Sequence, residues 1–170
     1  MRSLSTCLSR SAVALTGIFI AGLARAAAPA SIATPSDAQV VATMAATGVQ
    51  VYSCEYDDAH QLTWVFKSPL ATLYDTNGQA AIHHAAGPSW QADDGSKITG
   101  HVLAQSPSQT ADSIPQLLLE TKSAGSAGVL AQVRFVQRVD TAGGTAPTQP
   151  CTTEHQRGES PYFAHYVFLK

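Results

Sequence analysis

Hydrophobic and polar residues alternate with a period of two along most of the chain after residue 48, the pattern of β-strands that bury one face. In residues 48–56, Tyr52, Cys54 and Tyr56 share one face. The strand candidates that follow are residues 62–66, 71–75, 89–92, 97–105, 117–122, 129–141 and 162–169. The run that starts at Val129 alternates most clearly, whereas the run from Tyr162 is apolar on both faces and is expected to be a central strand.

Turn-forming residues separate these runs at short intervals, among them Ser68-Pro69, Gly87-Pro88 and Asp93-Asp94-Gly95-Ser96. Such spacing is typical of an all-antiparallel protein, so a mainly β fold is expected, either an antiparallel sandwich or a barrel. One short helix is predicted over residues 35–46. Pro35 suits the first position of that helix, and Gly48 can end it.

The N-terminus has the three parts of a signal peptide. Basic residues precede an apolar stretch at 11–24, and small residues follow at the spacing that signal peptidase reads, which predicts cleavage after Ala26 or Ala28. The apolar stretch is shorter than the roughly 20 residues that span a membrane, and no second one follows. We therefore expect a signal peptide (1–26), a lead-in with the short helix (27–47) and one β-rich domain (48–170). The protein would be secreted or periplasmic, with no transmembrane segment after cleavage.

Charge and cysteine content support this compartment. Three of the ten Lys and Arg residues lie in the signal peptide and all twelve Asp and Glu residues lie after it, so the mature charge is −5 without a basic cluster. That excludes the electrostatic footprint of a nucleic-acid-binding protein. Cys7 leaves with the signal peptide, and Cys54 and Cys151 are expected to form one disulfide. A metal pair or a redox pair stays open as an alternative, although no C-x-x-C motif is present.

No enzyme signature is present in the chain. It has no G-x-S-x-G, no H-E-x-x-H and no Gly-rich phosphate loop, which favours a non-enzymatic protein. Adjacent His83 and His84 would face opposite sides of a strand. His101 should be solvated, and His165 is interpreted as a core histidine. The spacing of these histidines predicts no metal site, and no cofactor is expected.

Two further features could bind a ligand. The segment Asp93–Ser96 offers oxygen atoms to a cation, but a hairpin turn is favoured there. Five aromatic residues could line one end of a barrel and bind a small apolar or sugar-like ligand, or they could be ordinary core; these are Tyr52, Tyr56, Trp64, Tyr74 and Trp90.

Several motifs in order resemble one family of exported bacterial and fungal proteins, domain-of-unknown-function family 3455. The residues that carry the resemblance are the segment His84-Ala85-Ala86-Gly87-Pro88-Ser89-Trp90 with Asp94-Gly95-Ser96, Gly48 to Cys54, Ile114-Pro115, Val136 to Val139, Gly143-Gly144, Cys151 and Pro161-Tyr162. The resemblance implies a secreted single domain with a cysteine pair, and no established activity or catalytic residues. Gln116 stands where this pattern leads us to expect Trp.

The leading hypothesis is an exported β-domain without enzymatic activity that binds a small ligand, a glycan or another exported protein. Its binding residues are predicted to be His84, Trp90, Asp94 and Ser96, which carry polar and aromatic groups in an irregular region. One alternative is a hydrolase-type enzyme with His84 and Asp94 as its acid/base pair. A second alternative is a structural component of the envelope or matrix.

Overall fold

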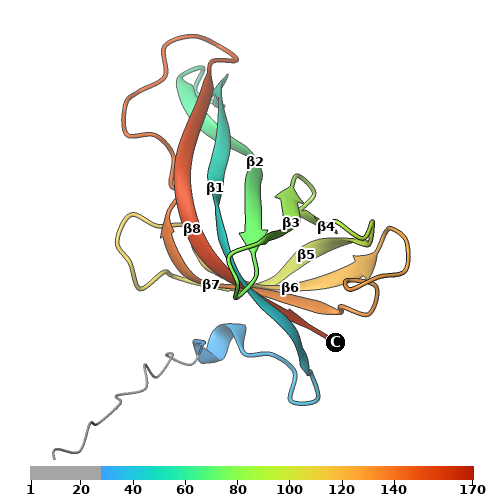
Figure 1. Cartoon of the computed structure of the whole chain (residues 1–170). Coiled ribbons are helices and arrows are strands. Elements are labelled where there is room, and N and C mark those ends of the chain that lie inside the picture. Colours follow the sequence, from blue (N-terminus) through green and yellow to red (C-terminus); the bar gives the residue numbers. More distant parts are fainter. Residues whose placement is uncertain (1–27) are drawn as a thin grey trace, which may run out of the picture.

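The computed structural model describes residues 28–170, so the predicted signal peptide lies outside the described residues. Residues 28–170 form eight strands, each antiparallel to the next, and the last pairs with the first to close a barrel (Figure 1). The strands are β1 (Val40–Tyr56), β2 (Leu62–Tyr74), β3 (Ala80–Ala85), β4 (Ser89–Ala92), β5 (Lys97–Ser106), β6 (Gln116–Ser123), β7 (Phe135–Gly143) and β8 (Arg157–Leu169). The predicted mainly β, antiparallel fold is confirmed, and its form is a barrel. Within 28–170, no helix is both long enough and apolar enough to cross a membrane.

The core follows from the alternation along β8, which lies between β1 and β7 as expected of a central strand. Its even-numbered residues Tyr162, Ala164, Tyr166 and Phe168 are buried inside the barrel. His165 therefore faces the other side, where its Nδ1 lies 3.0 Å from Asp140 Oδ2. The interpretation of His165 as a core histidine is wrong, because the inward register of β8 is the even one.

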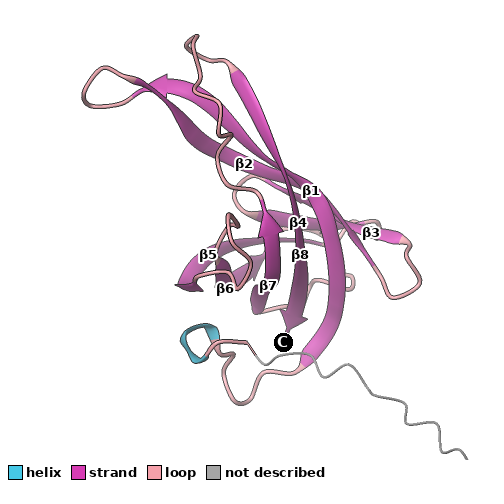
Figure 2. Ribbon diagram, turned by 90° about the vertical axis from the view of Figure 1, so that its left-hand side faces the viewer, coloured by secondary structure: helices cyan, strands magenta, loops and turns pink. Residues whose placement is uncertain are grey.

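The helix predicted over residues 35–46 is also wrong. Residues 40–46 are the first part of β1 and pair with β8, from Val40 opposite Leu169 to Ala46 opposite Ala164. This Ala-rich segment has good helix propensity, but pairing along the barrel wall outweighs so weak a preference. The one helical element in the described part is a 3-10 turn, η1 (Ala30–Ile32), whose Ile32 is fully buried (Figure 2, cyan).

Gly48 lies in the middle of β1 and ends no helix. A Cβ at this position would lie 2.2 Å from the carbonyl oxygen of Leu70 and 2.5 Å from Cα of Ala71. Both atoms belong to the backbone of β2, so neither can move aside cheaply. Glycine is therefore required where β1 and β2 approach this closely.

The strand predicted from Val129 begins only at Phe135. Residues 129–133 instead make two turns, with Ala131 N–H donating to Gly128 O and Val133 N–H donating to Leu130 O. Leu130 and Val133 still enter the core, whereas Val129 is half-exposed. Of the alternating residues Val129, Ala131 and Val133, only Val133 is buried, so the alternation predicted neither the buried residues nor the conformation of this segment.

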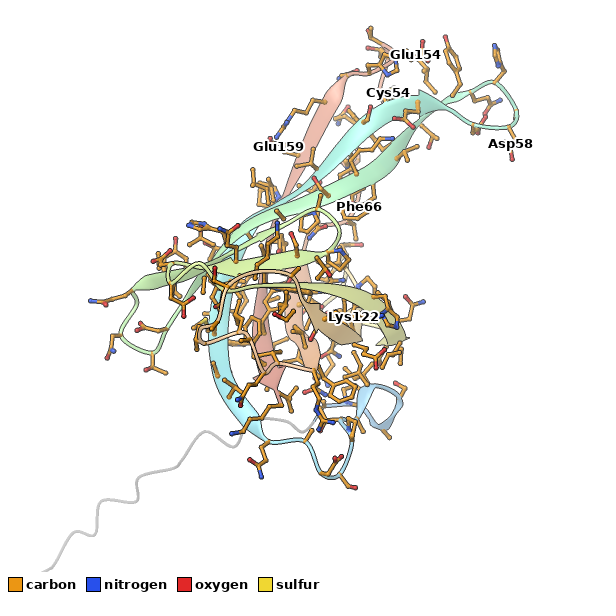
Figure 3. The ribbon with its side chains drawn as sticks, turned by 90° about the vertical axis from the view of Figure 1, so that its right-hand side faces the viewer. Cys54, Asp58, Phe66, Lys122, Glu154 and Glu159 are labelled. Carbon is orange, nitrogen blue, oxygen red and sulfur yellow. A yellow bond between two sulfur atoms is a disulfide. The ribbon has the colours of Figure 1, made fainter. Side chains whose placement is uncertain are left out.

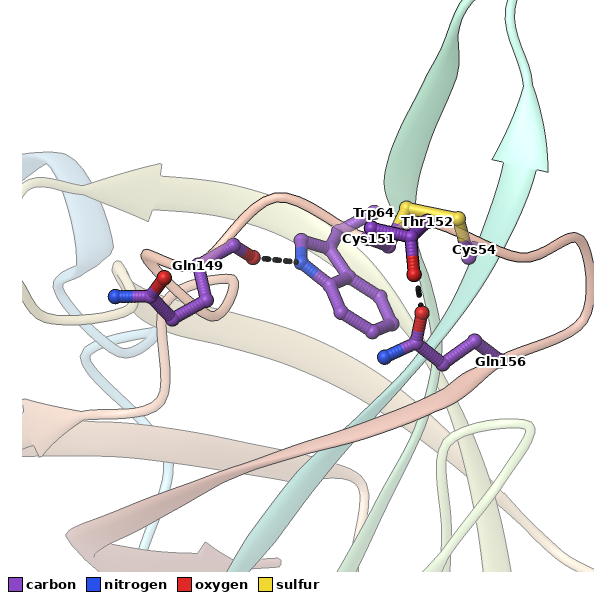
Figure 4. The surroundings of a disulfide bond; sticks show 6 residues. All are labelled: Cys54, Trp64, Gln149, Cys151, Thr152 and Gln156. Atoms are coloured by element: carbon purple, nitrogen blue, oxygen red, sulfur yellow. Dashed lines mark hydrogen bonds between the residues drawn. A yellow bond between two sulfur atoms is a disulfide. The ribbon is translucent and has the colours of Figure 1, made fainter.

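The outer ends of β1, β2 and β8 project beyond the barrel as a three-stranded extension, which we call the arm (residues 52–66 and 151–160) (Figures 1 and 3). Figure 3 shows Cys54, Asp58 and Glu154 at its far end. The expected disulfide between Cys54 and Cys151 is confirmed and joins positions 97 residues apart. Beside it, Trp64 Nε1 donates to the carbonyl oxygen of Gln149 over 2.8 Å (Figure 4).

Candidate functional site

A cavity of about 560 Å³ is lined by buried residues such as His84, Trp90 and Tyr166 and by half-exposed residues of β2 and β5. We infer that it opens through the barrel wall between β2 and β5. The opening follows from strand length. β3 and β4 have 6 and 4 residues, against 13 in β2 and 10 in β5. β3 pairs with β2 only from Ala71 onward, and β4 pairs with β5 only up to Thr99. Beyond these points the two long strands face each other across a gap in the wall.

We call this gap the mouth and define it by Phe66 and Pro69 of β2, Pro88 of the β3–β4 turn, and Val102 of β5. All four line the cavity, and Phe66 and Val102 are half-exposed. Figure 3 places Phe66 near the base of the arm. A small molecule could therefore enter from the side, below the arm, without any strand of the closed part of the barrel separating.

His84 lies deep in the cavity and is electrically neutral. It is 3 % exposed, stacks on Trp90 with ring centroids 4.6 Å apart, and meets Tyr166 edge-on. Burial lowers the pKa of His84 to about 4; the hydrogen bond with the Ser89 carbonyl opposes this shift and the Arg138 charge adds to it. Since a carbonyl only accepts, Nδ1 carries the proton in the 2.8 Å contact with Ser89 O. Nε2 is then a hydrogen-bond acceptor.

Two buried donors also line this cavity. Gln50 is 2 % exposed and Trp90 is 1 % exposed, yet Gln50 Nε2 and Trp90 Nε1 have no hydrogen-bond partner among the described residues. Gly100 makes room for this indole, because a Cβ there would lie 3.1 Å from Trp90 Cζ3. Buried donors in folded proteins are nearly always paired, so unpaired donors on two residues of one cavity are unusual. Both nitrogens are shielded from contact in this conformation.

Arg138 supplies the positive charge of the cavity. Its Nε and Nη2 donate to the carbonyl oxygen of Pro115 over 3.2 and 2.8 Å. Burial raises the pKa of Tyr52 and of Tyr166, and in both cases the charge of Arg138 opposes the increase. No Asp or Glu lines the cavity, and Lys67, the other cation that does, is ion-paired with Glu55.

The four predicted binding residues separate into two pairs. His84 and Trp90 lie together in the cavity, whereas Asp94 and Ser96 do not line it. Asp94 Oδ1 accepts from the N–H and the hydroxyl of Ser96 over 2.9 and 2.6 Å, and Oδ2 accepts from Val129 N–H over 2.7 Å. These bonds, led by the Ser96 hydroxyl, hold the pKa of Asp94 below its usual value. The pair thus fastens the β4–β5 turn, expected as a hairpin, to residues 129–130.

The proposed acid/base pair of His84 and Asp94 is not assembled. Asp94 follows Ala92, which lies opposite Ile82, about 7 Å along β3 from His84. The hydrogen bonds of the Asp94 carboxylate go to Ser96 and Val129, and His84 Nδ1 is occupied by Ser89. The two side chains belong to different hydrogen-bond networks.

Sequence reasoning named only part of the cavity. Of the five candidate aromatic residues, Tyr52 and Trp90 line it, while Trp64 lies on the arm and Tyr56 is exposed against His60. Gln50 could have been found, because it shares the strand face of Tyr52 and Cys54 and is a polar residue on a predicted core face. Arg138 carried no such signal, because in the strand predicted over residues 129–141 it lies on the face opposite Val133, Phe135 and Val139.

Within residues 28–170, no three His, Cys, Asp or Glu side chains lie close enough together to hold a metal ion. A family model described as a protein of unknown function (DUF3455) matches residues 35–170, which confirms the resemblance seen in the sequence. Neither the curated proteins nor the solved structures contain a match to this chain.

Proposed function

We propose that this chain, which belongs to the DUF3455 family of proteins of unknown function, is an exported, non-enzymatic barrel that binds one small ligand through the mouth. The cavity volume of about 560 Å³ falls within the range of roughly 300 to 1,000 Å³ that is usual for small-molecule sites. Its walls are mostly aromatic and aliphatic with a few polar groups, the composition typical of such sites. The disulfide fits an oxidising compartment outside the cytoplasm.

The observation that carries this proposal is a cavity of ligand size whose lining includes Gln50 and Trp90, two residues whose buried donors, Gln50 Nε2 and Trp90 Nε1, have no partner among the described residues. Each donor costs about 1 to 3 kcal/mol while it stays buried without a partner. A bound molecule recovers that cost when a side-chain rotation turns these nitrogens toward the cavity. Neither a structural envelope component nor an ordinary packed core gives a reason for two such donors in one cavity.

The proposal favours a small ligand over a glycan or a protein partner because the polar groups lie inside the barrel. The donors on Gln50 and Trp90 and the acceptor on His84 are all nearly fully buried. A protein surface cannot reach groups at that depth. A hydrolase-type enzyme is less favoured, because His84 and Asp94, the acid/base pair considered from the sequence, belong to different hydrogen-bond networks.

The test uses the neutral fluorescent probe N-phenyl-1-naphthylamine and a matched pair of variants. Val102 and Leu103 are adjacent in β5 and equally exposed at 49 %, but only Val102 lines the cavity. The probe should bind saturably with one site per chain. Val102→Trp, which narrows the mouth, should weaken binding at least about tenfold, which corresponds to 1.4 kcal/mol. Leu103→Trp should leave binding unchanged. Probe binding that is absent, or that both variants change equally, would refute the proposal.

A further inference from the structure

We propose that the ligand is a monocarboxylate on an apolar body, with its carboxylate held at Arg138 and its body along the barrel wall. This inference rests on the proposed function, because it names the chemistry of the molecule that the cavity binds. It comes from the charge, the donors and the acceptor of the cavity taken together.

The charge of the cavity selects an anion. Arg138 lines it, no carboxylate does, and Lys67 already has Glu55 as its partner. A half-buried cation is costly to desolvate, and Arg138 has no counter-ion within residues 28–170. The guanidinium is a planar fork that matches a carboxylate with two parallel hydrogen bonds. Two of its five donors are used on Pro115, and it also hydrogen-bonds the Tyr166 hydroxyl. The domain that encloses this cation is acidic overall, so the local positive charge is a feature of the cavity.

The uncharged polar groups point to a single carboxylate. An ionised carboxylate only accepts hydrogen bonds and has about four acceptor sites, which suits the donors of Arg138, and those of Gln50 and Trp90 once their side chains turn toward the cavity. His84 is different, since its Nε2 carries a lone pair and the residue lines the same cavity. That lone pair repels a second anionic group and accepts from a hydroxyl or an N–H. The cavity thus discriminates against dicarboxylates at its His84 end.

The remaining walls call for an apolar body. Val102, Leu117 and Leu119 supply aliphatic surface, and Phe66 and Trp90 supply aromatic surface. Burial of that surface provides the non-directional part of the affinity, about 25 cal/mol for each Å² removed from water. Both an alkyl chain and an aromatic ring satisfy these walls, so the test includes one acid of each kind.

The experiment measures binding affinity by isothermal titration calorimetry. The protein is expressed with its predicted signal peptide (residues 1–26) so that it is exported before purification. The probes are decanoate and indole-3-acetate, each compared with its neutral primary amide. At least one acid should bind ten or more times tighter than its amide, and raising the salt concentration should weaken the acid alone. Arg138→Gln should remove the preference of acid over amide. Arg134→Gln is the matched control, because Arg134 is an exposed arginine paired with Asp37 outside the cavity, and it should keep the preference.

The outcomes separate the two proposals. If acids and amides bind equally, with or without salt, the carboxylate inference is overturned and the small-ligand function stands. If neither acids, amides nor N-phenyl-1-naphthylamine bind, the proposed function itself fails. If Arg138→Gln does not fold, Arg138→Lys replaces it, because lysine keeps the charge but lacks the planar guanidinium that makes two parallel hydrogen bonds. Arg138→Lys should retain salt-sensitive binding of the acid at reduced affinity, and an unchanged affinity would overturn the assignment to Arg138.

Discussion

Polar side chains inside a barrel of this size are costly unless each has a partner, and the residues around His84 show how the cost is shared. His84 satisfies one nitrogen with Ser89 and stays neutral, Tyr52 donates to the carbonyl oxygen of Gly144 over 2.7 Å, and Arg138 holds Pro115. Gln50 and Trp90 alone are left with unpaired donors among the described residues. Paired polar groups contribute to the stability of the barrel, whereas these two unpaired donors lower it and therefore need another explanation.

The neutral state of His84 predicts a pH dependence of stability. In the folded protein the pKa of His84 is about 4, below the 6.5 that is ordinary for histidine in an unfolded chain. Between these two pH values the unfolded chain binds a proton that the folded chain does not. Stability is therefore lost as the pH falls through this window, by about 2 kcal/mol from pH 7 to pH 5. Urea unfolding at the two pH values measures the loss. His84→Asn should show a flatter profile, because the asparagine does not titrate.

The matched control for this measurement is His83→Asn, because His83 is the next residue and points outward into solvent. It should retain the full loss between pH 7 and pH 5. Glu55, Asp75 and Asp94, whose carboxyl pKa values are lowered, also contribute stability that is lost in acid, but only below the ordinary pKa values of 4.5 for Glu and 3.8 for Asp. A His84→Asn variant with the wild-type slope would contradict a buried neutral histidine.

At the scale of elements, the sequence predicted most strands better than it predicted their boundaries and inward faces. Period-two alternation and turn residues located β4 at residues 89–92 and most of β5 and β6, because these strands bury one face and end at Gly or Pro turns. Residues 35–46 were misread because Ala and Met favour helices locally, whereas β8 pairs with this segment from 118 to 129 residues away. The cavity depends on the same long-range pairing. Local pattern could therefore identify His84 and Trp90 but could not show that Arg138 faces them.

We expect the disulfide of the arm to contribute to stability but not to binding. The disulfide joins residues 97 positions apart, so its removal frees a long loop in the unfolded chain and should lower the free energy of unfolding by about 4 kcal/mol. The double variant Cys54→Ala/Cys151→Ala should show this loss in urea unfolding. It should still bind N-phenyl-1-naphthylamine under native conditions, because neither cysteine lines the cavity. Loss of probe binding in a variant that keeps the barrel's circular dichroism would show that the arm shapes the site.

At the scale of the whole molecule, the barrel combines a closed part and an open part. β1 pairs with β8 over nearly its whole length, and no strand edge is free there. On the other side, β3 and β4 end early, and the edges of β2 and β5 above them have no strand partner in the described part of the chain. Free edges expose backbone groups and favour local opening. The closed side positions Arg138 and Tyr166, and the open side would admit the proposed ligand.

This division predicts where hydrogen exchange should respond to binding. In the free protein, amides of β2 at residues 66–70 and of β5 at residues 101–106 should exchange faster than those of β1 and of β8 from residue 162 onward, because these two segments have a strand neighbour on one side only. Saturation with N-phenyl-1-naphthylamine should slow exchange at both segments and at the Gly87-Pro88 turn, since a bound molecule closes the mouth. The tip of the arm at residues 57–61 serves as the internal control, because it does not line the cavity and should not change. Slowing confined to the tip would place the binding site on the arm and would contradict entry through the barrel wall.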